Sequence, residues 1–260
     1  MKILSIGNSF SQDAHKWLKP ICESAGEEIY NVNLFIGGCS LEMHWNNFVN
    51  DSAAYDFEVA GVCQKKSSIR EALQSEKWDV ITFQQASHDS GLPETYVPYL
   101  KCLADEVRKI CPGAKFYIHQ TWAYELDSNH GGFANYHNDQ KEMFRKLTEA
   151  YKEAGRMIDG EMIPVGTIIQ YLREKCPEFD YKNGGLSLNR DGFHLSQLYG
   201  RYAAALTWYC CLLGGDVRKV SFVPRIEEET TDESLLEVIK KAVQDVLVSR
   251  MYYGDGDCRG

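Results

Sequence analysis

The sequence predicts an α/β fold in which a central parallel sheet of about five strands is covered by helices on both faces. Short apolar runs, typical of buried strands, alternate five times with segments of helical periodicity. The chain has 260 residues, of which 44% are hydrophobic, and this is enough for one core. We therefore expect one domain over residues 1–260, with its core at about 1–215 and a helical extension at about 222–250 packed on it.

The first strand and the turn that follows it are the most informative part of the chain. The apolar run Lys2–Ile6 is typical of a buried strand, residues 7–11 (GNSFS) form a small polar turn, and helical periodicity follows over Asp13–Gly26. Such a turn places a hydroxyl at the carboxyl edge of a parallel sheet, where α/β proteins bind ligands. A structural interpretation competes with this one, because Ser9 or Ser11 would also cap the helix.

The later elements follow from the same patterns. Runs of β-branched and aromatic residues predict strands at Glu28–Ile36, Trp78–Gln84, Ala114–His119 and Met157–Gly160, and a small hairpin or edge insertion at Tyr55–Val59 and Val62–Cys63. Helical spacing predicts helices at Leu41–Asn50, Ser67–Glu76, Leu92–Cys111, Asp139–Ala154, Pro164–Lys175 and Ser196–Leu213. A last apolar stripe predicts a helix that packs back on the sheet layer. One apolar face does not distinguish it from a dimer helix, so the protein is expected to be a monomer or a homodimer.

Charge and composition limit the partners. The net charge is −9 and no block of Lys and Arg stands out, which argues against nucleic acid and anionic membranes. No apolar stretch approaches the length of about 18 residues that a spanning helix needs. Met1 and Lys2 lead directly into the first strand, so no signal peptide is expected and the chain as given is predicted to be cytoplasmic. A secreted form whose signal has been removed would have the same sequence.

Cysteine and histidine spacing predicts no metal and no cofactor. The nine cysteines are an odd number without a CxxC pair, which is typical of reduced thiols in the cytosol. The seven histidines contain no HExxH motif, and only the loop residues His130 and His137 lie near each other in sequence. The adjacent residues His88 and Asp89 are not expected to form a dyad, because neighbours on a strand point to opposite faces.

A second informative stretch lies near the other end of the core. Asp191 and His194 are three residues apart in the loop segment Asn189–Ser196. This spacing lets the carboxylate orient the imidazole, whose other nitrogen would act as the base that a serine nucleophile requires. The turn Gly7-Asn8-Ser9 together with Asp191-x-x-His194 resembles the first and last sequence blocks of the SGNH/GDSL hydrolase superfamily. The motif GNSFS resembles the first block of a bacterial branch of this superfamily. The resemblance covers about residues 1–215.

The resemblance implies a three-layer α/β/α, flavodoxin-like sandwich and a serine esterase. Ser9 would be the nucleophile, His194 the base and Asp191 its orienting acid. The N–H groups of Ser9 and Gly38 would stabilise the oxyanion, with Gly37 as the alternative to Gly38. The Gly-Gly pair is also compatible with a plain tight turn.

The third sequence block departs from the superfamily pattern. The usual Gly-x-Asn-Asp is absent after the strand Trp78–Gln84. The sequence there resembles the Gln-Gly-Glu variant of carbohydrate-esterase branches, which places Gln85 in the position of the side-chain oxyanion donor. Gln84 is the alternative, because its amide has the same chemistry.

The expected substrate is a short acyl ester, with acetyl favoured, carried by a saccharide. The long segment Gln120–Asn138 mixes aromatic and amide side chains, which suits a sugar, and Trp122, Tyr124 and Trp45 are predicted substrate contacts. The same aromatics would equally suit packing against the sheet. A non-catalytic carbohydrate-binding protein, a flavodoxin-type nucleotide module and a transferase that uses the same triad remain alternatives. The nucleotide module is disfavoured because the chain lacks GxGxxG and Walker motifs.

Overall fold

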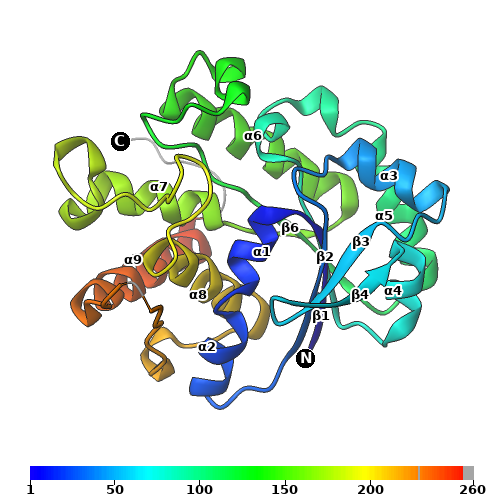
Figure 1. The fold of residues 1–260 in the computed structure, drawn as a ribbon, viewed down its shortest axis with the longest axis horizontal. Helices are drawn as coiled ribbons and strands as arrows, with labels where there is room; N and C mark the ends of the chain where they lie inside the picture. Colours follow the sequence, from blue (N-terminus) through cyan, green and yellow to red (C-terminus); the bar gives the residue numbers. More distant parts are fainter. Residues whose placement is uncertain (228, 254–260) are drawn as a thin grey trace.

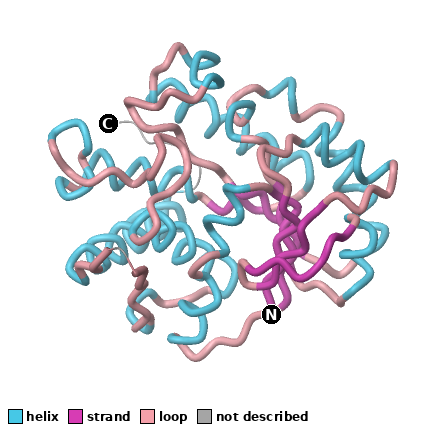
Figure 2. Tube along the Cα trace, in the orientation of Figure 1, coloured by secondary structure: helices cyan, strands magenta, loops and turns pink. Residues whose placement is uncertain are grey.

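In the computed structural model, which describes residues 1–227 and 229–253, the strands form one central sheet surrounded by helices (Figure 1, Figure 2). Within those residues the sheet has seven strands, in the order β4 (Val62–Ser67), β3 (Tyr55–Val59), β2 (Tyr30–Phe35), β1 (Lys2–Gly7), β5 (Val80–Phe83), β6 (Lys115–His119) and β7 (Glu161–Ile163). The strands β2, β1, β5, β6 and β7 are all parallel to one another. Their chain order is second, first, third, fourth and fifth, which is the flavodoxin-like order. The predicted fold class is confirmed.

The hairpin β3–β4 extends the parallel sheet at one edge. β3 pairs antiparallel with β2, and β4 pairs antiparallel with β3. The hairpin therefore accounts for the difference between the five strands expected in the parallel sheet and the seven found in the described residues. It lies at the sheet edge, as the sequence indicated.

Helices cover both faces of the sheet. Figure 1 shows α1, α2, α7, α8 and α9 on one side and α3, α4 and α5 on the other, with α6 in contact with α5. Their bounds are α1 (Ser9–His15), α2 (Leu18–Ser24), α3 (Leu41–Val49), α4 (Ile69–Ser75), α5 (Tyr99–Ile110), α6 (Gln140–Ile158), α7 (Val165–Lys175), α8 (Tyr199–Leu213) and α9 (Glu233–Tyr253). Short 3₁₀ turns are η1 (Ser87–Asp89), η2 (Pro93–Thr95), η3 (Gly131–Tyr136), η4 (Pro177–Phe179), η5 (Tyr181–Asn183) and η6 (Val217–Lys219).

The first helix differs from the prediction. The expected helix Asp13–Gly26 is two helices, α1 and α2, and α1 begins earlier, at Ser9. Pro20 explains the break. In a continuous helix its ring would clash with the carbonyl of Lys16, and its missing N–H could not bond to that carbonyl. The chain therefore turns at Lys16 and Trp17 before α2 begins.

The predicted strand Met157–Gly160 is wrong. Met157 and Ile158 belong to α6, because Tyr151, Ala154 and Ile158 continue its buried face at helical spacing. The last parallel strand is β7, which begins after that helix ends. The predicted helix Leu92–Cys111 is likewise shorter, since Pro98 precedes the first helical residue of α5.

The last helix, α9, packs against α7 and α8. Its buried side chains include Leu236, Ile239 and Val243, three members of the apolar stripe. In the part of the chain that the structure describes, no helix combines the length and apolar character needed to cross a bilayer.

The parallel strands bring four segments to one edge of the sheet. β1 leads to Ser9, β2 leads to the turn that contains Gly38, β5 leads to Gln85, and β6 leads into residues 120–138. Because the strands are parallel, these segments lie at the shared carboxyl edge. The candidate residues from the first half of the chain therefore start from neighbouring positions.

Candidate active site

Asn8, rather than Ser9, caps the helix that follows β1. Asn8 has extended backbone angles, and its Oδ1 accepts the N–H of Phe10 at 3.0 Å. In return, the N–H of Asn8 donates to Ser11 Oγ at 3.1 Å. Because Asn8 and Ser11 satisfy the cap, the hydroxyl of Ser9, the first residue of α1, is left for another contact.

That contact is His194. Its Nε2 lies 2.9 Å from Ser9 Oγ, and its Nδ1 lies 2.7 Å from Asp191 Oδ2. The other carboxylate oxygen, Oδ1, accepts the backbone N–H groups of His194 at 2.7 Å and Phe193 at 3.2 Å. The structure thus brings together Ser9, His194 and Asp191, which we call the candidate triad.

The electrostatics of Asp191 determine which nitrogen of His194 carries the proton. Partial burial raises the pKa of Asp191, but the hydrogen bonds from the ring and N–H of His194 and from the N–H of Phe193 outweigh it, so the pKa lies below its usual value. The carboxylate is therefore ionised at neutral pH and can only accept hydrogen bonds. The proton of neutral His194 is then on Nδ1, and the lone pair of Nε2 faces Ser9 Oγ.

The segment after β6 holds the turn that carries His194. The indole N–H of Trp122 donates to Phe193 O at 2.7 Å, and the N–H of Glu125 donates to Gly192 O at 2.7 Å. Gly192 has a φ of +83°, and a Cβ there would lie 3.0 Å from Ser128 Cα. A side chain at this position would therefore be strained and would crowd the neighbouring segment.

Trp122 and Tyr124 do not offer a surface to a ligand, which corrects the prediction that they contact substrate. Both are fully buried. The ring of Trp122 stacks on Phe10 with centroids 4.2 Å apart, and the hydroxyl of Tyr124 pairs with Ser87 Oγ at 2.8 Å. Both rings therefore pack inside the protein, against α1 and η1 respectively.

Partly exposed rings lie beside His194 instead. The Phe193 ring is 4.2 Å from that of His194 and 4.8 Å from that of His130, between centroids, and His130 stacks on His88. Burial lowers the pKa of His130, and electrostatic repulsion from the nearby imidazoles of His88 and His194 adds to this, while Asp191 opposes it. Phe193 precedes His194 in the chain, whereas His88 lies in η1 and His130 caps η3, and no short spacing in the sequence linked these two histidines to His194.

Trp45 does not line the candidate triad. It borders a cavity of about 490 Å³ whose other lining residues, Cys102, Asp105, Glu106, Arg108 and Lys109, all belong to α5. The predicted contact between Trp45 and a substrate at Ser9 is corrected accordingly, since its ring lies between α3 and α5.

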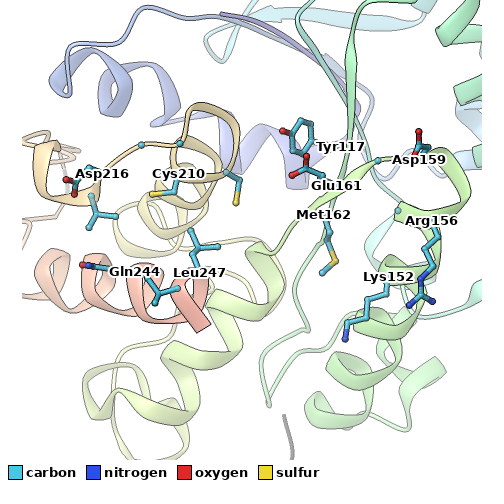
Figure 3. A pocket seen from close by; sticks show the side chains of 17 residues that line it. Tyr117, Lys152, Arg156, Asp159, Glu161, Met162, Cys210, Asp216, Gln244 and Leu247 are labelled. Atoms are coloured by element: carbon cyan, nitrogen blue, oxygen red, sulfur yellow. The ribbon is translucent and has the colours of Figure 1, made fainter. Parts of the chain in front are cut away.

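A larger cavity, of about 910 Å³, also lies away from the candidate triad. It opens beside Glu161 and Met162, at the amino end of β7, and contains none of the three triad residues. Figure 3 shows Lys152 and Arg156 on one side of the opening and Gln244 on the other.

Gly38 lies on a turn that is tied to the turn before Ser9. Its φ is +65°, in the left-handed region that glycine adopts without strain. The side-chain N–H of Asn8 donates to Cys39 O at 3.1 Å, which joins the two turns. Among the hydrogen bonds of the described residues, none uses the N–H of Ser9 or of Gly38 as a donor.

Gln85 is fully engaged elsewhere, which corrects the prediction that it donates to an oxyanion. Its Nε2 donates to the carbonyl and to the hydroxyl of Thr95, both at 3.0 Å. Its Oε1 accepts the N–H groups of Leu41 at 2.9 Å and Ala86 at 2.8 Å. The side chain is buried and joins three loops rather than facing Ser9.

Gln84, the alternative donor, forms the middle of a buried chain of hydrogen bonds. Asn8 must turn its Oδ1 toward the N–H of Phe10, so the Gln84 amide that approaches Oδ1 at 2.5 Å is the donor Nε2. Gln84 Oε1 then faces His119 Nδ1 at 2.8 Å, which must carry the proton. Burial lowers the pKa of His119 to about 3, so this imidazole is neutral.

Two other pairs of Ser, His or Asp side chains lie close together outside the candidate triad. His15 Nε2 lies 2.7 Å from Ser5 Oγ, but both side chains are fully buried and no substrate reaches them. His88 Nε2 lies 3.4 Å from Asp89 Oδ2. These two residues are in η1 rather than on a strand, so the argument that they point apart does not apply to them. Among the described residues, no cluster of His, Cys, Asp or Glu side chains has an arrangement suited to a metal ion.

Comparisons with solved structures find proteins of similar fold. The chain is similar to a candidate SGNH hydrolase from Slackia heliotrinireducens (23% identity, TM-score 0.54, covering 80% of this chain and 96% of that one). It is also similar to a lipase/acylhydrolase from Enterococcus faecalis (15% identity, TM-score 0.53, covering 82% and 95%). These matches confirm, at the level of the fold, the resemblance to the SGNH/GDSL superfamily. The comparison with curated proteins finds no match.

A nearer relative is a DUF4886 family protein from Bacteroides uniformis. The two chains are 35% identical with a TM-score of 0.84, and the match covers 98% of this chain and 96% of that one. The family model described as "Domain of unknown function (DUF4886)" matches residues 2–246. The chain with this candidate triad therefore belongs to the DUF4886 family and has the fold of the SGNH hydrolases.

Proposed function

We propose that this protein is a serine hydrolase that cleaves carboxylic esters. The observation that carries the proposal is the hydrogen-bonded row Ser9, His194 and Asp191, with 2.9 Å between Ser9 Oγ and His194 Nε2 and 2.7 Å between His194 Nδ1 and Asp191 Oδ2. Ser9 Oγ attacks the ester carbonyl while His194 Nε2 takes its proton. Asp191 holds the imidazole in the required tautomer and stabilises its cation.

The negative charge on the carbonyl oxygen needs donors that are not already engaged. The N–H groups of Ser9 and Gly38 fit this role, because among the described residues neither is used as a hydrogen-bond donor. The bond from Asn8 to Cys39 O holds their two turns together. Proton transfer from His194 to the leaving alcohol gives an acyl-enzyme. Water, with His194 again as base, then releases the acid.

We further propose a short acyl group, acetyl, on a saccharide. The partly exposed rings of Phe193, beside His194, and of His130, beside Phe193, support a ligand with flat faces, and the exposed Asn129 adjoins His130 in the chain. Hydrolysis rates would be compared for acetylated saccharides and for simple alkyl esters of increasing acyl length. A preference for long acyl chains would contradict this part of the proposal.

The direct test is reaction with a fluorophosphonate, followed by intact-mass analysis and peptide mapping. One adduct on Ser9, together with ester hydrolysis, is the expected result. Ser9→Ala should lose both. Ser68→Ala is the matched control, since it removes only a hydroxyl that caps α4. A folded protein that forms no adduct and binds saccharides unchanged would favour the non-catalytic alternative.

A further inference from the structure

We propose that Asp13 is the positioning residue that holds His194 against Ser9. The inference rests on the proposed function for its catalytic readout and on geometry for the rest. Asp13 is the fifth residue of α1, one helical turn after Ser9, so the two side chains lie on the same face of the helix. Its carboxylate is completely buried and is not part of the candidate triad.

The carboxylate binds the segment that carries His194. Asp13 Oδ2 accepts the backbone N–H of Leu195, the residue after His194, at 2.8 Å. Asp13 Oδ1 accepts Arg190 Nη1 at 3.0 Å, and that arginine lies four residues before His194. Arg190 also donates its backbone N–H to His194 O at 2.9 Å. Asp13 therefore binds the chain on both sides of His194, at Arg190 before it and at Leu195 after it.

A second arginine connects Asp13 to helix α8. Arg201 Nε, from α8, donates to Asp13 Oδ1 at 2.7 Å. Arg201 is 11% and Arg190 27% exposed, so the buried carboxylate has two partly buried cations as its partners. Hydrogen bonds from two cationic side chains offset the desolvation cost of a buried carboxylate.

Two contacts from one helical turn tie the segment to α1, in addition to the bonds that Trp122 and Glu125 make to Phe193 and Gly192. Ser9 touches the ring of His194, and Asp13 binds the backbone of Leu195. A single contact would let the segment rotate about that point in any direction, whereas two contacts one turn apart restrict both sliding and rotation. The short Ser9 to His194 distance therefore depends on a carboxylate that touches neither residue of that bond.

The experiment compares the full-length protein with Asp13→Asn, which keeps the size of the side chain and removes its charge. The first readout is the low-field NMR resonance of the His194 Nδ1 proton, assigned by its loss in His194→Ala. The second is the division of the effect between kcat and KM. We expect the resonance to shift or broaden. We also expect kcat and the rate of Ser9 labelling to fall together by about 100-fold, with KM little changed, as for a misplacement of about 1 Å.

Ile239→Ala is the control for stability alone. Ile239 is fully buried in α9, which packs on α7 and α8. It should lower the melting temperature without moving the His194 resonance or kcat. If Asp13→Asn behaves like this control, the proposal is overturned.

Arg201→Gln provides a milder variant in case Asp13→Asn does not fold. It removes one donor and leaves the bonds of Asp13 to Arg190 and Leu195. We expect a change in the same direction, with a fall in kcat of about tenfold. An unchanged His194 resonance and kcat would contradict the role of Asp13. If the parent protein neither hydrolyses esters nor labels at Ser9, the proposed function fails, and the NMR readout still decides whether Asp13 positions His194.

Discussion

The side-chain amide of Asn8 donates to the carbonyl oxygen of Cys39 at 3.1 Å, and this bond joins the turn before Ser9 to the turn that carries Gly38. The orientation of the amide is determined by its surroundings, because its oxygen must face the N–H of Phe10. One side chain thus caps α1 and aligns the two N–H groups proposed to stabilise the oxyanion.

Asn8→Asp should reduce activity while leaving the helix cap intact. Asp caps helices as well as Asn does. Its second oxygen, however, cannot donate to Cys39 O and would repel it. Loss of alignment at one oxyanion donor costs up to about 10²–10³ in rate, so we expect kcat to fall at least tenfold with a small change in melting temperature. The same cap exchange at α4, Ser68→Asp, should leave kcat unchanged, and full activity of Asn8→Asp would argue against this role.

Asp191→Asn should nearly abolish hydrolysis without unfolding the protein. The backbone N–H groups that now bind Asp191 Oδ1 would keep the amide oxygen in place, so its NH₂ would face His194 Nδ1. The proton of His194 would then move to Nε2, and no lone pair would face Ser9. A fall in kcat of about 10³–10⁴ is expected, measured on a short acyl ester. Asp127→Asn, which changes an exposed carboxylate bonded to Tyr181, is the control and should remain active.

Trp122→Phe should lower both stability and kcat. It removes the donor to the partly buried carbonyl of Phe193, at a cost of up to about 1–3 kcal/mol. The matched control is Trp208→Phe. Trp208 is equally buried, but its N–H has no partner among the described residues, so the same exchange breaks no hydrogen bond. Equal losses of kcat in the two variants would show that ring size, and not the bond to Phe193, matters.

Gln85→Ala should affect folding more than catalysis. The substitution leaves the N–H groups of Leu41 and Ala86 and the carbonyl of Thr95 without their partner. We expect a loss of a few kcal/mol in the free energy of unfolding, from denaturant titration. At temperatures where the variant is folded, kcat should fall by much less than 10². A selective loss of 10²–10³ in kcat with normal stability would instead identify Gln85 as an oxyanion donor.

Buried histidines should make the protein sensitive to mild acid. Burial lowers the pKa of His15, His44 and His119 to about 3. In the unfolded chain their pKa is about 6.5. Between about pH 6.5 and pH 3 the unfolded state therefore binds more protons than the folded state, and the free energy of unfolding decreases as the pH is lowered. Each histidine lowers the free energy of unfolding by about 1.4 kcal/mol per pH unit, so the three together lower it by about 4 kcal/mol per pH unit.

Urea titrations at pH 7, 6 and 5 would measure this slope. His44→Asn should reduce it by about one third, whatever its effect on stability at pH 7. His137→Asn is the control, because His137 is exposed, and it should leave the slope unchanged. A free energy of unfolding that is flat from pH 7 to pH 5 would contradict the prediction.

The parts of the fold and site that the sequence predicted depend on local patterns. The parallel strands are short apolar runs, and Asp191 and His194 are close enough in the chain for their bond to follow from spacing alone. The break between α1 and α2 was not predicted, although Pro20 is a local signal for it, because its ring would clash with the carbonyl of Lys16 in a continuous helix.

The unpredicted parts depend on the tertiary path of the chain. Gln85 has the chemistry of an oxyanion donor, but the course of the segment at Thr95 brings other acceptors to it first. Trp122 has a ring suited either to a sugar or to a core, and only the position of Phe10 decides between them. Asp13 meets Arg190 across a separation of 177 residues, which no local pattern encodes.

The bond between Ser9 and His194 joins residues 185 positions apart. During synthesis Ser9 therefore leaves the ribosome among the first residues, while His194 follows only after every described strand of the sheet has been made. A truncated product that ends before His194 would contain the strands of the sheet and lack the complete candidate triad. Cutting the chain at one of the loops between Ser9 and His194 would divide the candidate triad between two fragments. Neither fragment alone should hydrolyse esters, so activity recovered on mixing would measure their reassembly.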